Sequence, residues 1–309
     1  MPLHRLTEIV LGVPNLEATA EYYTEFGLIP EVSADRSEYR FSTTDGGQQM
    51  RLVHAPMRRL LSLGLGVDDS DDLDRIGRQL DRLGVEYRRN DNRLDTVEPA
   101  TQLPVVVTVA SHLVQVPTPA PAPNAPGAIA RPGLRAPAIY RTDPVRPRKL
   151  GHIVVGTTDL NTSQAFFTEG IGFKVTDIVL GFGVFLRCTP DHHNLLLQHA
   201  PVSFLHHTSW EVNDIDEIGQ GAHAMLEGHP ERHTWGLGRH WVGSNYYYYL
   251  RDPSGNMTEY YSDMDEIVDD QMWEPTVFEL HSAPRSWGPP APPSFIEPDD
   301  LAELMAGLH

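Results

Sequence analysis

Three residues in the second half of the chain have the types and the spacing of a metal-binding set. His152, His207 and Glu259 are separated by 55 and 52 residues, and each interval is the length of one strand–helix–strand unit with its loops. Each side chain is therefore expected on a different strand of one small sheet, and inward side chains of a curved sheet converge. Two histidines and one carboxylate, with other positions open, form the facial set of non-haem Fe(II) oxygenases.

An internal repeat shows which elements would hold these residues. Residues 6–28 align with residues 150–173 with one residue added, and each copy reads as a strand, a turn and a helix that ends at Gly27 or Gly172. Alternating strands and further helices with apolar spacing follow in both copies. The other aligned segments are 54–56 with 199–201, 61–69 with 207–214, and 98–107 with 252–261.

The residues that could bind a metal occur in the second copy alone. The aligned pairs are His152 with Glu8, His207 with Ser62, Glu259 with Val105, and His193 with Gln48. The first copy cannot form the same set, so the repeat predicts a metal-free first half and a metal-binding second half. The clustering of histidines agrees, because ten of the fifteen lie between residues 152 and 240.

The repeat also predicts the domain organisation. Each half contains two units of strand, helix and further strands, which makes four units in the chain. Nine prolines between residues 117 and 147 indicate an extended linker between the halves, and the Trp- and Pro-containing end is expected to pack on the second half as a brace or lid. The predicted boundaries are 1–110 for the metal-free domain, 111–149 for the linker, 150–263 for the catalytic domain and 264–309 for the tail.

Composition excludes several classes of partner. The formal charge of −18 repels phosphate backbones and anionic membranes. No apolar run approaches the roughly 20 residues of a membrane span, and the first residues lack the pattern of a signal peptide. The single cysteine, Cys188, cannot form an intrachain disulfide. These observations predict a cytoplasmic protein that binds neither nucleic acid nor membranes.

The segment from residue 238 to residue 259 carries a longer motif. It reads Gly-x-His, a spacer, Tyr-x-x-Asp-Pro-x-Gly, a short spacer and Glu, and these positions are filled by Gly238, His240, Tyr249, Asp252, Pro253, Gly255 and Glu259. This motif resembles the signature of type I extradiol ring-cleavage dioxygenases of the vicinal oxygen chelate superfamily, of the 2,3-dihydroxybiphenyl and catechol 2,3-dioxygenase type. The resemblance covers about residues 3–263, and Tyr248 departs from it where the pattern prefers an aliphatic residue or Phe.

The resemblance implies a fold and a metal. The fold would be α+β, with four βαβββ-type modules that form two curved, barrel-like mixed sheets. His152, His207 and Glu259 would bind Fe(II), and Mn(II) accepts the same ligands. His207 is preferred to His206, which alternation along the strand places on the opposite face.

The resemblance also implies roles for other residues. His193, rather than His192, would be the acid–base residue that meets oxygen, while His240 and Tyr249 would flank the catechol hydroxyls. Three further residues near the motif are expected to line the pocket and contact the substrate: Trp241, Asn245 and Tyr247.

The predicted function is extradiol cleavage, in aromatic hydrocarbon catabolism, of a substituted or apolar catechol next to its diol, with O₂ and Fe(II) as requirements. The protein is expected to form a homo-oligomer, as this family commonly does. Two alternatives use the same fold: a non-oxygenase metalloenzyme such as an isomerase or lyase, and a small-molecule-binding resistance protein. The combined presence of three ligands and of His193, His240 and Tyr249 favours the oxygenase.

Overall fold

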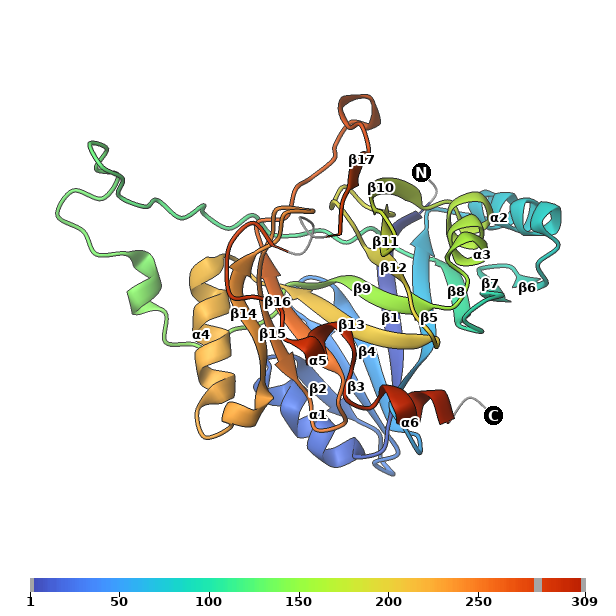
Figure 1. The fold of residues 1–309 in the computed structure, drawn as a ribbon, viewed down its shortest axis with the longest axis horizontal. Coiled ribbons are helices and arrows are strands. Elements are labelled where there is room, and N and C mark those ends of the chain that lie inside the picture. The colour runs from blue at the N-terminus through green and yellow to red at the C-terminus, as the bar shows by residue number, and fades with distance from the viewer. Residues whose placement is uncertain (1–2, 281–284, 307–309) are drawn as a thin grey trace.

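Two mixed β-sheets, each flanked by short helices, make up the computed structural model, which describes residues 3–280 and 285–306 (Figure 1). The elements of the first half are β1 (Leu3–Val13), α1 (Leu16–Glu25), β2 (Ile29–Val32), β3 (Glu38–Thr43), β4 (Gly47–His54), β5 (Arg59–Val67), α2 (Ser70–Leu83), β6 (Tyr87–Asn90), β7 (Arg93–Val97) and β8 (Pro104–Val109).

The second half repeats this order and continues into the C-terminal segment. Its elements are β9 (Lys149–Thr157), α3 (Leu160–Ala165), a π-helix (Phe166–Ile171), β10 (Lys174–Val179), β11 (Gly183–Arg187), β12 (Leu195–His199), β13 (Phe204–Glu211), α4 (Ile215–Leu226), β14 (His233–Arg239), β15 (Tyr246–Arg251) and β16 (Met257–Ser262). The C-terminal segment contains β17 (Thr276–Phe278), α5 (Pro293–Ile296) and α6 (Leu301–Ala306), and short 3-10 turns lie at Pro137–Tyr140, Pro230–Arg232 and Asp270–Met272.

The strand orders confirm the duplication and the predicted fold class. The first sheet has the order β2-β3-β4-β1-β5-β8-β7-β6, and the second has β10-β11-β12-β9-β13-β16-β15-β14 when read in the same direction, with β17 added beside β10. Each half is thus two βαβββ modules joined at an antiparallel central pair, β1 with β5 and β9 with β13.

The residue added in the second copy has a defined place. The first helix, α1, is an ordinary α-helix, and Gly27 at φ +101° follows it. Its counterpart changes from α-helix to π-helix at Phe166 and ends before Gly172, at φ +104°. A π-helical turn takes in one extra residue without breaking the helix, so the two helices end at equivalent glycines.

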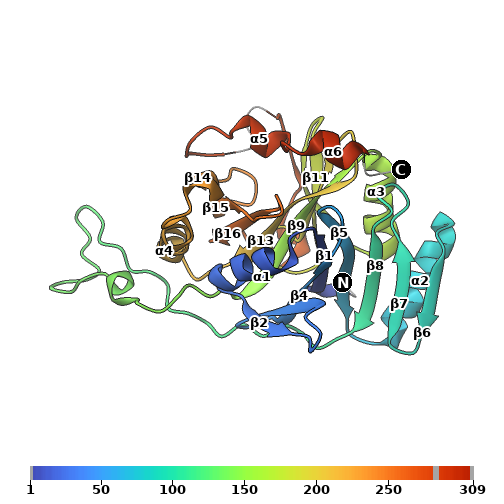
Figure 2. The same cartoon turned by 90° about the horizontal axis from the view of Figure 1, so that it is seen from below.

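The two halves share one core, and each supports the other. Phe26, just after α1, stacks on Tyr260 of β16 with ring centroids 3.9 Å apart, and the Tyr22 hydroxyl lies 2.5 Å from that of Thr258. Helix α1 of the first half thus covers the back of β16 in the second (Figure 2). In the other direction, Gly170 of the π-helix lies against Leu80 of α2.

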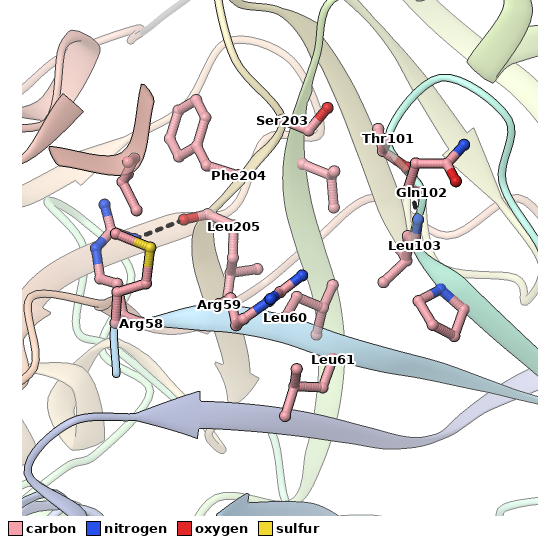
Figure 3. Close-up of a pocket in the computed structure, with 14 residues that line it drawn as sticks. Arg58, Arg59, Leu60, Leu61, Thr101, Gln102, Leu103, Ser203, Phe204 and Leu205 are labelled. Carbon is pink, nitrogen blue, oxygen red and sulfur yellow. Dashed lines mark hydrogen bonds between the residues drawn. The ribbon is translucent and has the colours of Figure 1, made fainter. Parts of the chain in front are cut away.

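A pocket of about 250 Å³ lies where the first half, the second half and the C-terminal segment meet (Figure 3). The Arg58 guanidinium at its rim donates to the Leu205 carbonyl at 2.9 Å and to both carboxylate oxygens of Asp300. Arg58 therefore ties β13 and the start of α6 to the first half.

The segment between the two sheets, residues 110–148, runs along the surface and extends away from both of them (Figure 1). It is tied down by Arg141, which donates to Asp214 at the start of α4, and by Arg148, which donates to Asp45. In the parts of the chain that the structure describes, no helix is long and apolar enough to cross a membrane.

The C-terminal segment packs along the second half. Strand β17 pairs with β10, the Trp287 carbonyl accepts from the Arg239 amide at 3.0 Å, and Trp235 donates its indole N–H to the Pro289 carbonyl at 2.8 Å. Helix α5 then lies beside β13 and β15, with the Phe295 ring 4.7 Å from that of Tyr249. The predicted site residues thus lie between the sheet and this segment.

Candidate active site

The predicted metal ligands come from three adjacent strands. His152 of β9 pairs with Ser209 of β13, which pairs with Glu259 of β16. Residues paired in this way point to the same face of a sheet, and His207 shares that face because it lies two residues before Ser209. The structure therefore brings together His152, His207 and Glu259, whose ligand atoms all lie within 4.8 Å of one another.

The donor atoms of this set fit a divalent metal ion. The Glu259 Oε2 atom is 3.1 Å from His152 Nε2 and 3.5 Å from His207 Nε2. All three side chains are buried, yet His207 Nε2 and Glu259 Oε2 have no hydrogen-bond partner. Buried polar atoms without partners are costly, and imidazole nitrogens with a carboxylate oxygen suit Fe(II) or Mn(II).

The protonation states agree with this use. Burial lowers the pKa of His207 to about 4, so the imidazole is neutral at pH 7 and keeps a lone pair for a metal. Burial opposes ionisation of Glu259, but the surrounding imidazoles of His152, His207 and His240 outweigh it and hold its pKa well below the usual range. A carboxylate and a neutral imidazole are the forms that bind metal ions.

His206 departs from the expectation of simple alternation. The pairing of β13 with β9 shifts by one residue between Leu205 and His207, and this bulge turns His206 toward the cavity as well. Its Nε2 lies 2.5 Å from the Phe295 carbonyl and its Nδ1 lies 2.8 Å from His207 Nδ1. Because a carbonyl only accepts, His206 holds its proton on Nε2, and burial lowers its pKa so that the ring is neutral.

The neutral His206 ring leaves its Nδ1 as an acceptor, so His207 must supply the proton of the bond between the two rings. His207 then carries its hydrogen on Nδ1, and its Nε2 lone pair faces Glu259 and His152. A hydrogen bond to the far nitrogen of a ligand histidine fixes the ring and its tautomer in this way. Helix α5 thereby helps to orient a predicted metal ligand.

A second pair of adjacent histidines is built on the same plan. His192 Nε2 lies 2.9 Å from the Asp177 carboxylate, and His192 Nδ1 lies 3.1 Å from His193 Nδ1. The Thr276 amide of β17 donates to the other oxygen of Asp177 at 2.7 Å. In the neutral pair, the proton between the rings belongs to His193 Nδ1, which leaves His193 Nε2 as an acceptor.

His193 lines the cavity beside the ligand set, with its ring 4.2 Å from that of His152. Burial, with the neighbouring histidines adding, holds the pKa of His193 well below its usual value. His193 is therefore a neutral base at pH 7, next to the position that a metal would occupy.

His240 and Tyr249 lie on the opposite side of the ligand set. The Tyr249 hydroxyl is 2.9 Å from His240 Nε2, and His240 Nε2 is 3.6 Å from Glu259 Oε1. Burial raises the pKa of Tyr249 well above its usual value, and the Glu259 carboxylate adds to the effect. Tyr249 thus remains protonated and can act as a hydrogen-bond donor.

The three residues expected to contact substrate lie elsewhere. Trp241 is 55% exposed, Asn245 donates its amide to Glu259 Oε1 at 3.2 Å, and Tyr247 stacks against His240 with centroids 4.0 Å apart. None of the three is among the residues that line the cavity. In this geometry Asn245 and Tyr247 support Glu259 and His240 from behind.

The ligand set opens into a cavity of about 260 Å³. Its inner wall is apolar and comes from β9, β10, β11 and β12, with Val154, Val179, Phe185 and Leu196 among its residues. Leu280, Phe295 and Ile296 of the C-terminal segment close the other side. Among the described residues that line it there is no Lys, Arg, Asp or Glu, so the cavity favours an uncharged, largely apolar guest.

Sequence patterns missed several residues of this site. Asp177, Gln198 and Phe295 were not singled out, because each lies outside the motif and none has a spacing that indicates a role. The adjacent histidine pairs, His192–His193 and His206–His207, were a usable signal, since the two rings of each pair share a hydrogen bond between their Nδ1 atoms.

The strand registers correct one alignment between the halves. In the first sheet Glu8 pairs with Gly64, which pairs with Val106, and this row is equivalent to that of His152, Ser209 and Glu259. The residue equivalent to Glu259 is therefore Val106, not Val105. The valine still cannot bind a metal, and Glu8 is instead held by Gln48 at 2.6 Å and by Arg51 at 3.2 Å.

Comparison with known proteins agrees with the fold. Residues 149–260 match the Glyoxalase/Bleomycin resistance protein/Dioxygenase superfamily. Metapyrocatechase 2 of Cupriavidus necator is 33% identical over 194 residues, which is 60% of this chain and 60% of that protein. The chain spans 40% to 60% of the length of the first curated relatives that it matches.

Two solved structures share the fold over nearly the whole chain. The Mn(II)-bound glyoxalase of Novosphingobium aromaticivorans is 24% identical with a TM-score of 0.75, covering 94% of this chain and 93% of that one. The homoprotocatechuate 2,3-dioxygenase of Brevibacterium fuscum, in its anaerobic complex with 3,4-dihydroxyphenylacetate, is 18% identical with a TM-score of 0.76, covering 95% and 91%. At these identities the likeness concerns the fold.

Proposed function

We propose that the protein is an extradiol dioxygenase that cleaves the ring of an uncharged, apolar catechol next to its diol, with Fe(II) or Mn(II) held by His152, His207 and Glu259. The observation that carries the proposal is the position of this ligand set, which faces an apolar cavity between His193 on one side and the His240–Tyr249 pair on the other. The relative Metapyrocatechase 2, by its name, acts on a catechol.

The bound metal would supply Lewis acidity that lowers the pKa of the catechol hydroxyls, and open positions for the diol and for oxygen. Tyr249 donates its hydroxyl proton to negative charge that develops on a substrate oxygen. His193 Nε2 accepts a proton from the diol and returns it later in the reaction. The C-terminal segment and the apolar wall exclude water from the ring.

The test is oxygen consumption by the Fe(II)-loaded protein with a panel of neutral catechols that includes 2,3-dihydroxybiphenyl. We expect one O₂ consumed per ring opened, a visible absorbance from the product, and both atoms of ¹⁸O₂ in that product. Absence of oxygen uptake with every catechol, despite a full metal complement, contradicts the proposal. The Mn(II)-loaded protein, assayed in parallel, shows which metal supports turnover.

The ligand set is tested separately by metal binding. His207→Ala removes one of three ligands and leaves Glu259 without its second imidazole, so metal retention after desalting should fall to background. His223→Ala is a matched control, because His223 is exposed on α4, and this variant should retain the metal fully. Equal metal contents in the two variants would contradict the assignment.

A lyase or isomerase on the same fold is the second candidate, since a Mn(II)-bound glyoxalase shares the architecture. Such an enzyme turns over its substrate without oxygen. Anaerobic assays therefore separate the two functions, because product formation that persists without oxygen supports the second.

A further inference from the structure

Apart from the histidines, one side chain among the described residues that line the cavity has a polar group and no hydrogen-bond partner. Gln198 of β12 lines the cavity and is 5% exposed. Among the hydrogen bonds of the described residues, none involves its side-chain amide. Its amide atoms are not among the fully enclosed polar atoms that lack a partner, so the amide is accessible from the cavity and can exchange hydrogen bonds with water for hydrogen bonds with a guest.

Gln198 lies at the far end of the cavity from the metal ligands. It pairs with Gly156 of β9, which lies four residues beyond His152. The rise of a strand places Gly156, and with it Gln198, ~13 Å along the sheet from His152. The residues between these levels are apolar, with Leu196 paired with Val154 and Phe185. The cavity therefore has the metal set at one end, an apolar middle and one amide at the other end.

The amide is neutral, and among the described residues that line the cavity no charged side chain accompanies it. A carboxylate on the substrate would find no cation there and would lose its hydration. A hydroxyl, carbonyl or ether oxygen, or an amide, can instead exchange one or two hydrogen bonds with Gln198, because the amide both donates and accepts.

Resting on the proposed function, we infer that Gln198 is a specificity residue, which binds a neutral hydrogen-bonding group at the distal end of an apolar substituent on the catechol. The substituent has about the length of one further ring or a short alkyl chain, as the cavity volume of about 260 Å³ allows. A buried polar group that pairs with one substrate and is left unpaired by its apolar isostere discriminates strongly between the two.

The experiment compares two isosteric catechols, one with a butyl and one with a hydroxypropyl substituent. Each is made as two isomers, with the substituent on the ring carbon next to the diol or on the following ring carbon. Their kcat/KM values are measured with the wild-type protein and with Gln198→Met, which keeps the side-chain length and removes the amide. Binding of the same pairs without oxygen is measured by calorimetry. Gln271→Met, at an exposed position, is the matched control.

In the wild type we expect the hydroxypropyl compound to be preferred over the butyl compound. The ratio of the two kcat/KM values should fall about tenfold in Gln198→Met and stay unchanged in Gln271→Met. The ratio of the two affinities measured by calorimetry should change in the same way. Activity with unsubstituted catechol is measured for each variant as the reference rate, because that ring does not reach β12.

An equal ratio in the wild type and Gln198→Met overturns the inference and shows that the amide is satisfied by water alone. In that case ring cleavage of both compounds still supports the proposed function. If no catechol is cleaved by the metal-loaded wild type, the proposed function fails instead, and calorimetry alone then decides whether Gln198 recognises the hydroxyl. Preference for 3,4-dihydroxyphenylacetate over the neutral compounds also overturns the inference.

Discussion

At the scale of single residues, the site depends on histidines that occur in adjacent pairs. In each pair the second residue faces the reacting region, and the first fixes it through a bond between Nδ1 atoms. The first members differ in what anchors them: the Asp177 carboxylate holds His192, and the Phe295 carbonyl holds His206. Both anchors assign the tautomer of the functional ring, which has two chemically distinct nitrogens.

His193→Ala removes the proposed base without touching a ligand atom. We expect metal content and catechol affinity to remain close to wild type while kcat falls by about 10² to 10⁴, the range for loss of a general acid–base group. Metal analysis and steady-state oxygen uptake measure the two effects. A variant that turns over at the wild-type rate would remove His193 from the mechanism.

Asp177→Asn tests whether the His192–His193 pair depends on its carboxylate anchor. The amide can donate as well as accept, so His192 is no longer held in one tautomer, and His193 loses its fixed orientation. We expect kcat to fall about tenfold or more, at the lower end of the effect of outer groups that orient a site, with KM and metal content unchanged. Asp95→Asn, at a half-buried position on β7 of the first half, is the control. A change in KM alone would show that Asp177 shapes the cavity and does not orient His193.

At the scale of elements, the C-terminal segment completes the site. It supplies one wall of the cavity, the carbonyl that anchors His206 and the amide that anchors Asp177. Its end is fixed to the first half by Asp300, whose carboxylate accepts two hydrogen bonds from the buried Arg58. Docking of this segment and the geometry of the ligand set are therefore linked.

Asp300→Ala should lower the free energy of unfolding more than Asp299→Ala does. It leaves the Arg58 guanidinium, 4% exposed, without its anionic partner, and we expect the free energy of unfolding to fall by about 2 kcal/mol, the range for a hydrogen bond to a charged group. Asp299→Ala removes an exposed ion pair with Arg251, which is worth about 0 to 1 kcal/mol. Chemical denaturation of both variants measures the difference. Equal losses of stability would contradict the proposed role of the Arg58–Asp300 pair in fixing the C-terminal segment.

At the scale of the whole molecule, the metal-free half has a structural role in the site. Glu259 lies between Thr258 and Tyr260, and these two neighbours point away from the cavity to pack on Tyr22 and Phe26 of the first half. The strand that carries the carboxylate is thus held along its edges by β13 and β15 and on the face away from the cavity by the first half.

Phe26→Ala should lower both stability and metal affinity. Truncation of a buried phenylalanine costs about 3 to 5 kcal/mol, and here it also leaves Tyr260, next to Glu259, without its stacking partner. Phe41→Ala is the matched control, since Phe41 is equally buried but lies on β3. We expect similar losses of stability, with a weaker metal affinity in Phe26→Ala alone. Equal metal affinities in the two variants would show that the halves are energetically independent at the site.

The sequence by itself determined the duplication, the fold class and the candidate set of metal ligands, because repeats, strand alternation and a 22-residue motif can be recognised along the chain. It placed His207 correctly on the strand face of His152 and Glu259, since neighbouring strands preserve alternation over short stretches. The motif also brought His240 and Tyr249 to the same region, because Tyr249 lies on β15 and His240 directly follows the adjoining strand β14.

Tertiary structure alone decided the remainder. Alternation misplaced His206, since a bulge adds one residue to a strand without a sequence signature. The position of Trp241 outside the cavity, the closure by Phe295 and the isolated amide of Gln198 all depend on contacts between segments far apart in the chain. Such contacts follow from how the two halves and the C-terminal segment pack, and the spacing of residues along the chain does not encode them.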